Sequence, residues 1–443
     1  MATDSSRGSR DLSLVVAGLA LGLATSWWLQ RRERLAGLPA PNAELKSIHV
    51  IGDVYLDMIA KVSRLPQWDG DTLIEMPIET HPGGSALNTA VQLASLINTR
   101  WREPKMRKTV KFDRCVLHSL VGEDVYGQVV TERIKDTGVE LSAPAVGGQG
   151  VCICLSGPTD RAFVSYRGTV ERLCERDIDR SVLLTPRTGH VHFAAYYDCT
   201  GLQRSMPTLM KEARAMGATI SLVPQSDSSG EWKTDLLDLL YLVDVLICNE
   251  EELARMTHLP RDEVDAAIQV LLNKRCKLIV VTRGREGAIA MSREERWEQP
   301  TMARQVVDTT GAGDAFAAGF LWGWCQEEDV RLGLIFGCAC GAAAVGQMGG
   351  SHPLSPLEIN KCMLGITPSV EPSARLDRRR LQRSRSQTQP ELLHSASSGD
   401  LAMAGSPTAL RNAQSDFSAD VGARWQLARA HGSSTSLALS NSS

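Results

Sequence analysis

The sequence predicts an α/β fold with a doubly wound, mostly parallel sheet and a second, smaller sheet beside it. Between about residues 110 and 250, short β-rich runs alternate with helical patterns, an order typical of strand–helix–strand units. Residues 72–80 and 162–168 instead form short alternating segments, which we expect to build a small β-sheet lid over the site. A glycine-rich turn directly before an apolar helix, at residues 308–323, indicates an anion-binding site.

The apolar run at residues 12–30 sets an N-terminal segment, residues 1–45, apart from the rest of the chain. The run is uncharged and long enough to span a bilayer as a helix, and Arg31, Arg32 and Arg34 follow it. Because positive charge favours the cytosolic side, we expect an N-terminal membrane anchor with the body of the protein facing the cytosol. The alternatives are an organellar targeting segment, for a mitochondrion or plastid, and a misassigned start.

Residues 46–365 carry the strand and helix patterns and should form the folded domain, whereas residues 366–443 are rich in Ser and Arg. This tail has too little apolar surface to offset chain entropy, which predicts disorder. Within it, Ser386 follows Arg383 by three residues, a spacing that suits phosphorylation by basophilic kinases. The alternative, which we favour, is a solvated charge run.

Net charge and cysteine content narrow the class of protein. A formal net charge of −3 does not favour nucleic acid as a partner. The 11 cysteines are scattered without a CxxC pair, which indicates buried thiols in a reducing compartment rather than a disulfide or zinc framework.

The first predicted strand and the glycines after it supply candidate substrate-binding residues. In α/β sheets the carboxyl ends of the strands line the ligand crevice, so Asp53 and Asp57 are candidates for binding ligand hydroxyls. The alternative is that they are turn or cap residues. Gly83 and Gly84 then precede a predicted helix with Asn88 near its start, where Asn88 can donate to a ligand or be solvated.

Two later strand ends predict metal-binding and nucleotide-binding residues. Asn249 and Glu252 lie three residues apart at a helix start, where their oxygens can hold Mg²⁺ through water or cap the helix. Thr282, Gly284 and Gly287 follow in a strand–turn–strand pattern. Glycines there let a nucleotide approach the backbone closely, while an ordinary hairpin is the alternative.

The segment DTTGAGDAF, residues 308–316, is the centre of the predicted site. Gly311 and Gly313 allow a tight turn that brings N–H groups together, and a helix from Ala312 adds unpaired N–H groups and partial positive charge. Asp314, in the first turn, can accept a proton from a hydroxyl that attacks a bound phosphoryl group. The alternative is a plain helix start with an acidic residue in its first turn.

Two motifs together, GGSALNTA at residues 83–90 and DTTGAGDAFAAGF at residues 308–320, make the chain resemble the ribokinase-like (PfkB) family of carbohydrate and nucleoside kinases. The resemblance runs from about Ser47 to about Pro356, with CNEEE and VTRGREG between the motifs in the family's order. It implies a three-layer α/β/α domain with a small β lid that transfers the γ-phosphoryl group of ATP to a primary hydroxyl.

The resemblance also implies roles for single residues. Asp314 resembles the family's catalytic base, and the backbone of Gly311, Ala312 and Gly313 resembles its anion hole. The other matches are Asp57, Gly83, Gly84 and Asn88 for sugar hydroxyls, Asn249 and Glu252 for Mg²⁺ and phosphate, Thr282 to Gly287 with Gly313 for ATP, and Asp308, Thr310 and Gly350 for a monovalent cation such as K⁺.

Departures from the family pattern bear on the substrate. Tyr55 stands where ribokinases carry Asn, and GGSALN replaces GGKGAN, which points away from ribose itself. We see no Lys or Arg cluster placed for a sugar phosphate. We expect a small sugar as substrate, with a nucleoside kinase of the adenosine type and a membrane-tethered, non-catalytic scaffold as alternatives. The exposed strands of a lid also suit pairing with a second copy, as a homodimer.

Overall fold

The computed structural model describes residues 45–74, 76–98, 111–157, 161–347 and 349–365. The predicted anchor at residues 12–30 and the predicted phosphorylation site at Ser386 lie outside these residues, so both stay predictions. Within the described ranges, no helix is long and apolar enough to cross a membrane.

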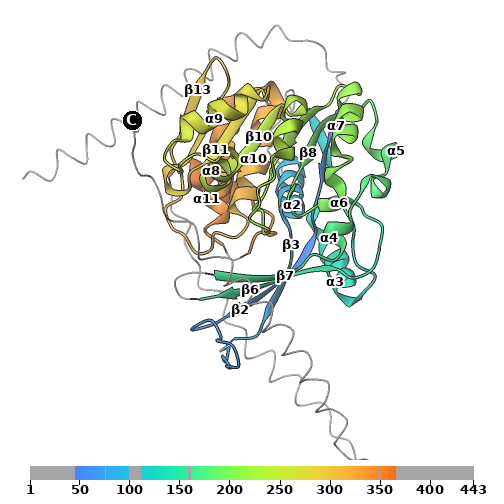
Figure 1. The fold of residues 1–443 in the computed structure, drawn as a ribbon, viewed down its shortest axis with the longest axis vertical. Coiled ribbons are helices and arrows are strands. Elements are labelled where there is room, and N and C mark those ends of the chain that lie inside the picture. The colour runs from blue at the N-terminus through green and yellow to red at the C-terminus, as the bar shows by residue number, and fades with distance from the viewer. Residues whose placement is uncertain (1–44, 75, 99–110, 158–160, 348, 366–443) are drawn as a thin grey trace, which may run out of the picture. The chain divides into compact units, whose positions relative to one another are not determined.

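The larger of two sheets confirms the predicted α/β fold. Its nine strands are β1 (Lys46–Ile51), β4 (Phe112–His118), β5 (Glu140–Ser142), β8 (Thr188–Phe193), β9 (Thr219–Leu222), β10 (Val245–Asn249), β11 (Leu278–Thr282), β12 (Ala288–Met291) and β13 (Arg296–Gln299). They lie in the order β13-β12-β11-β10-β9-β8-β1-β4-β5 (Figure 1). Every neighbouring pair is parallel except β11–β12 and β12–β13. The strand order reverses between β1 and β8, and such a switch point opens a ligand crevice at the carboxyl ends.

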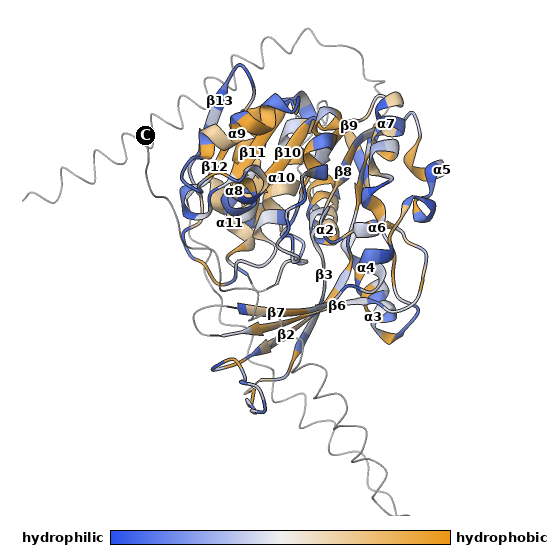
Figure 2. Ribbon diagram, viewed as in Figure 1, coloured by the Kyte–Doolittle hydropathy of each residue, from blue (hydrophilic) through white to orange (hydrophobic). Residues whose placement is uncertain are grey.

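Helices cover both faces of this sheet, as the alternating pattern predicts. The helices are α2 (Ser85–Asn98), α3 (Val125–Ile134), α4 (Thr169–Arg172), α5 (Arg180–Leu183), α6 (Thr200–Gln203), α7 (Met206–Ala215), α8 (Glu250–Thr257), α9 (Val264–Asn273), α10 (Ala312–Glu327), α11 (Val330–Ala344) and α12 (Pro356–Met363). Short 3₁₀ turns are η1 (Lys135–Thr137), η2 (Glu175–Asp177), η3 (Thr234–Leu242) and η4 (Gly284–Glu286). Along β1, Ile48 and Val50 join the hydrophobic core with α2 and α10, whereas Ile51 joins the core with α7 and α9. Figure 2 shows the apolar strands between these two helical layers.

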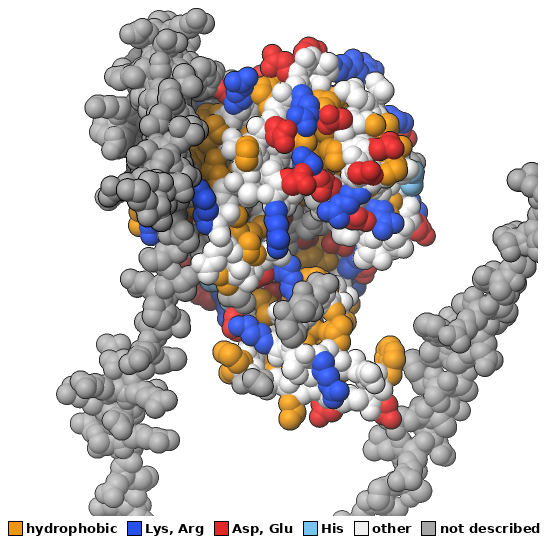
Figure 3. Space-filling model, turned by 90° about the vertical axis from the view of Figure 1, so that its left-hand side faces the viewer, with side chains coloured by type: hydrophobic (Ala, Val, Ile, Leu, Met, Phe, Trp, Pro, Cys, Tyr) orange, Lys and Arg blue, Asp and Glu red, His pale blue; other side chains and the backbone are white. Residues whose placement is uncertain are grey.

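The second sheet is the predicted lid, with a different membership from the one that the sequence suggests. It contains β3 (Glu79–Gly83), β2 (Tyr55–Lys61), β6 (Gly150–Ser156) and β7 (Arg161–Tyr166), in that order. Figure 3 shows hydrophobic side chains at the surface of this part of the molecule. The alternating pattern between residues 110 and 250 places β6 in the main sheet, which is wrong, and the lid strand expected at residues 72–80 lies instead at Glu79–Gly83. Short apolar runs do not reveal their partners, and here Asp57 lies opposite Cys152.

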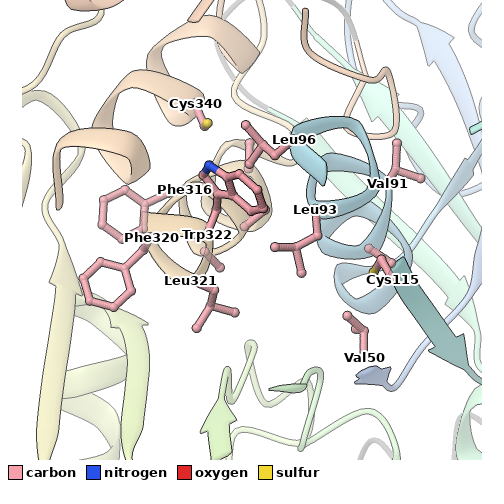
Figure 4. Packing of buried hydrophobic residues seen from close by; sticks show 14 of the residues in the cluster. Val50, Val91, Leu93, Leu96, Cys115, Phe316, Phe320, Leu321, Trp322 and Cys340 are labelled. Atoms are coloured by element: carbon pink, nitrogen blue, oxygen red, sulfur yellow. The ribbon is translucent and has the colours of Figure 1, made fainter. Parts of the chain in front are cut away.

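Close packing of α10 against α2 and α11 fixes the start of α10. Phe316, Phe320 and Leu93 are among the buried residues that join these helices (Figure 4). Glycine permits the close contact with α11, because a Cβ on Gly319 would lie 2.5 Å from the Phe336 carbonyl oxygen. Truncating a buried Phe to Ala typically lowers the free energy of unfolding by about 3–5 kcal/mol. This packing therefore holds α10 in place and positions the residues at its N-terminus.

Candidate active site

Most of the predicted site residues gather at one edge of the large sheet. Asp53 follows β1, Asn249 ends β10, and Thr282 ends β11 directly opposite Asn249. Parallel strands all end on the same edge, which explains why residues more than 200 positions apart in the sequence come together. The N-terminus of α10 faces the same edge, because Asp314 contacts the first turn of α2.

Asp314 is held by two side chains of α2. Its Oδ1 accepts a hydrogen bond from Ser85 Oγ at 2.7 Å, and its Oδ2 accepts one from Asn88 Nδ2 at 2.9 Å. Burial raises the pKa of Asp314 to about 7, opposed by these two hydrogen bonds and supported by the charges of Glu252 and Asp57. A carboxyl group with a pKa near neutral pH is suited to accept and return a proton.

The remaining acceptor of Asn88 is available to a ligand. Its Oδ1 is buried and has no hydrogen-bond partner among the described residues, although an unpaired buried acceptor costs about 1–3 kcal/mol. Because its Nδ2 is committed to Asp314, the amide is oriented with Oδ1 free to accept from a hydroxyl. Asn88 is therefore placed where the sequence predicts a substrate contact.

Among the described residues, the turn before α10 leaves backbone N–H groups without a hydrogen-bond partner. Gly311 has φ +70°, and a Cβ there would collide with the Gly350 Cα. The Ala312 N–H donates a hydrogen bond to the Thr309 carbonyl at 3.3 Å. The next two N–H groups along the chain therefore lack the usual helical acceptor four residues earlier. A Cβ on Gly313 would meet nothing within 4 Å, so there is open space at the helix N-terminus.

The two candidate substrate carboxylates are placed differently. Asp53 uses both oxygens at the start of α2, accepting from the N–H groups of Ser85 at 2.9 Å and Ala86 at 2.8 Å. The carboxylate of Asp57 lies against Gly83, where any Cβ would collide with it, and no described residue donates a hydrogen bond to it. Burial raises the pKa of each to about 7. Asp53 thus has the capping geometry of the alternative interpretation, and Asp57 is free to bind a ligand.

The residues predicted for ATP and Mg²⁺ lie at neighbouring strand ends. Asn249 and Glu252 form a capping box at the start of α8, with Asn249 Oδ1 2.8 Å from the Glu252 N–H and Glu252 Oε2 3.0 Å from the Asn249 N–H. Beyond Thr282, Gly284 and Gly287 adopt φ +52° and +102° in the turn between β11 and β12. The helix cap and the hairpin, which are the alternative interpretations of these two motifs, are therefore both present. Both arrangements still leave side-chain oxygens and accessible backbone at the site.

The carboxylates at this edge fit a magnesium ion that is bound partly by substrate. Glu252 is buried, and burial raises its pKa to about 7, so a cation nearby would favour its charged form. Among the described residues, no group of three or more His, Cys, Asp and Glu side chains could hold a metal alone. Mg²⁺ is commonly held by one or two carboxylates together with phosphates and water, and Glu252 can supply such a ligand.

An arginine of the lid contacts the residues that the sequence predicts as ligands of a monovalent cation. Arg161 Nη1 lies 2.9 Å from Asp308 Oδ1 and also donates to Thr310 Oγ1. The second oxygen of Asp308 accepts the N–H of Gly349 at 3.0 Å. The predicted ligands Asp308, Thr310 and Gly350 do come together, since Gly350 packs on Gly311, but a guanidinium group contacts the first two.

Several functional candidates escaped the sequence analysis. Ser85 lies within the motif GGSALN but gave no reason of its own to contact Asp314. Asp198, after β8, pairs with Arg167 at 3.3 Å, and its charge contributes to the raised pKa of Asp53. Arg161 and Arg167 lie at the two ends of one lid segment, so two basic side chains reach the site where the sequence indicated none. The alternation of this segment could have placed Arg161 on the site-facing side.

Comparisons with known proteins agree with this geometry. The family description "pfkB family carbohydrate kinase" matches residues 45–357. The ATP-dependent ribose-1-phosphate kinase of Halopiger xanaduensis is 28% identical, over 67% of this chain and 91% of that protein.

Two solved structures have the same fold. One is an E. coli protein described as a ribokinase II, in complex with ATP and Mg²⁺ (TM-score 0.60, 21% identical, 72% of this chain and 99% of that one). The other is adenosine kinase from Sinorhizobium meliloti (TM-score 0.60, 22% identical, 72% and 98%). The matched range contains every site residue described above, and we conclude that the chain belongs to the pfkB family of carbohydrate kinases.

Proposed function

We propose that this protein phosphorylates a primary hydroxyl of a small sugar, with ATP as the phosphoryl donor and Asp314 as the catalytic base. The observation that carries the proposal is the placement of Asp314 at the N-terminus of α10. Both of its oxygens are oriented by α2, its pKa is raised to about 7 by burial, and unpaired N–H groups lie beside it.

The proposed transfer is an in-line displacement. Asp57 and Asn88 Oδ1 accept hydrogen bonds from sugar hydroxyls and orient the substrate. Asp314 takes the proton of the attacking hydroxyl while the new oxygen–phosphorus bond forms and the bond between the γ-phosphorus and the β,γ-bridging oxygen breaks. The free N–H groups of the first α10 turn stabilise the charge on the transferring group, and ADP leaves.

Magnesium would be held through water by Glu252, beside the phosphates. When bound, Mg²⁺ neutralises the charge of the β- and γ-phosphates. The chain itself contributes the buried carboxylate of Glu252, which is oriented by a hydrogen bond from the Asn249 N–H.

A sugar suits this site better than a nucleoside. The groups beside Asp314 that can bind a ligand are hydrogen-bonding groups: the Asn88 amide and the Asp57 carboxylate. A polyol satisfies many such groups, whereas a nucleoside needs an apolar slot for its base. The relative from Halopiger xanaduensis acts on ribose 1-phosphate, which supports a pentose-like substrate and makes its phosphate ester part of the test. The nucleoside kinase remains the second candidate, because adenosine kinase has the same fold.

The test is ADP formation by the full chain with Mg²⁺-ATP and a panel of ribose, ribose 1-phosphate, fructose, other simple sugars, adenosine and pseudouridine. We expect turnover with a sugar or sugar phosphate. Replacing Asp314 by Asn should lower kcat by about 10²–10⁴-fold, the usual contribution of a general base, and should leave ATP binding intact. Asp262→Asn, an exposed carboxylate in a turn, is the matched control and should be unchanged.

Two results would contradict the proposal. Near wild-type turnover by Asp314→Asn would reject the base assignment. ATP binding without turnover of any compound would favour the non-catalytic scaffold.

A further inference from the structure

The lid contributes a positive charge to the turn that leads into α10. Arg161 is the first residue of β7, and its guanidinium reaches three side chains of the segment that precedes Gly311. Nη1 donates to Asp308 Oδ1 at 2.9 Å and to Thr310 Oγ1, and Nη2 donates to Thr309 Oγ1 at 2.5 Å. The Arg161 and Asp308 side chains are only 27% and 10% exposed, so solvent screens this pair less than a surface pair.

Both carboxylate oxygens of Asp308 accept hydrogen bonds. Besides Arg161, its Oδ1 accepts the Thr310 N–H at 3.0 Å and the Thr310 hydroxyl at 2.8 Å. Its Oδ2 accepts the Gly349 N–H at 3.0 Å. Burial raises the pKa of Asp308, but the hydrogen bonds from Gly349 and Thr310 and the charge of Arg161 outweigh it and hold the pKa below its usual value. A charged carboxylate thus faces a guanidinium, which does not lose its proton in proteins.

A monovalent metal ion does not fit beside this guanidinium. Such an ion would need several oxygen lone pairs at once, and the resemblance assigns it the oxygens of Asp308 and Thr310. Here Arg161 takes a lone pair from each, and the Gly349 N–H takes one from the second oxygen of Asp308. The expected K⁺ site and the observed ion pair therefore exclude one another.

We propose that Arg161 replaces the monovalent metal ion of this site, so that phosphoryl transfer by this chain requires no K⁺. Its role is to position the segment from Asp308 to Thr310. That segment in turn positions Gly311 and the first N–H groups of α10. Because Arg161 belongs to the lid, the same contacts tie the lid to the anion hole. The measurement of turnover rests on the proposed kinase function, whereas the measurement of cation binding by the thermal midpoint does not.

The first experiment compares cations with the wild-type full chain. Turnover is measured with Mg²⁺-ATP in KCl and in choline chloride at equal ionic strength. In parallel, the thermal midpoint is measured in the same two salts without substrates. We expect the same rate and the same midpoint in both salts, since no site for K⁺ is open.

The second experiment removes the guanidinium. Arg161→Ala should lose about tenfold or more of its turnover in choline chloride, in line with the cost of a displaced catalytic group. KCl should restore part of this loss and should raise the thermal midpoint of the variant alone, because the oxygens of Asp308 and Thr310 are then free. Arg64→Ala removes an exposed arginine between β2 and β3 and should behave as wild type. Arg161→Lys keeps a positive charge and should be less impaired than Arg161→Ala in choline chloride.

Three results would overturn the inference. Stimulation or stabilisation of the wild type by K⁺ would show that the ion binds despite Arg161. Loss of turnover in Arg161→Ala that no cation restores, with no K⁺ shift of its midpoint, would make Arg161 a direct ligand of a phosphate. An unchanged Arg161→Ala would show that the pair is dispensable. If the wild type turned over no substrate, the kinase proposal would fail, and the thermal midpoints would still decide whether K⁺ binds.

Discussion

At the residue scale, the proposed chemistry depends on carboxyl groups that are buried near one another. Asp53, Asp57, Glu252 and Asp314 each have a pKa raised to about 7, chiefly by burial. The charge of Asp57 and that of Glu252 both disfavour ionisation of Asp314. The pKa of Asp314 therefore depends on the charge states of Glu252 and Asp57.

This cluster predicts the pH dependence of turnover. Asp314 must be charged to accept a proton, so kcat/KM should rise with pH through about 7 and level off above it. Asp57→Asn removes one charge that raises the pKa of Asp314, so its inflection should lie at lower pH. The measurement is kcat/KM from acid to alkaline pH for both proteins. A profile that falls as pH rises through neutrality would be inconsistent with a carboxylate base.

At the scale of elements, the N-terminus of α10 depends on two glycines from different segments. Gly311 adopts φ +70°, and its Cα faces Gly350 so closely that neither position can carry a Cβ without displacement of the backbone. A Cβ on Gly350 would also lie 2.8 Å from Asn88 Nδ2, which holds Asp314. The turn before α10, the Asp314 carboxylate and α2 are thus packed as one unit.

Gly311→Ala should separate backbone strain from loss of site geometry. The left-handed backbone alone costs about 1–2 kcal/mol for a residue with a Cβ, and the collision with Gly350 should also displace the turn and lower kcat/KM about 10²-fold. Gly217→Ala is the matched control, because Gly217 has φ +86° and open space around its Cβ position. The control should lose stability by urea unfolding and keep its turnover. Equal turnover in both variants would argue against a tight requirement at Gly311.

At the scale of the whole molecule, the lid has two faces with different roles. Asp57, Cys152 and Arg161 lie on the face toward the site, since register and alternation place them together. On the opposite face, Ile153 lies directly across from Val164, and their side chains are 38% and 60% exposed. We propose that this apolar outer face pairs with a second copy of the chain.

A charge on the outer face tests this pairing. Val164→Lys should shift the mass measured by light scattering from dimer to monomer, because a buried unpaired ammonium group opposes association. Leu357→Lys, at an exposed leucine of α12, is the control and should leave the mass unchanged. A monomeric wild type at micromolar concentration would reject the lid dimer.

The sequence by itself determined the large sheet, the helix that begins at Ala312 and the gathering of Asp53, Asn249, Thr282 and Asp314 at one edge. It could do so because strand and helix periods and glycine turns are local properties, and alternation of strands with helices implies parallel strands that end on one edge. They fix where each side chain stands along its own element.

Only the tertiary structure decided which side chains meet. Asn88 and Asp314 are 226 residues apart, and Arg161 and Asp308 are 147 apart. Membership of β6 in the lid was likewise hidden, because a short β-rich run does not show which sheet it joins. Contacts of this kind depend on strand register and on the packing of distant elements. Periodicity therefore could not reveal that Arg161 contacts the residues expected to bind a metal ion.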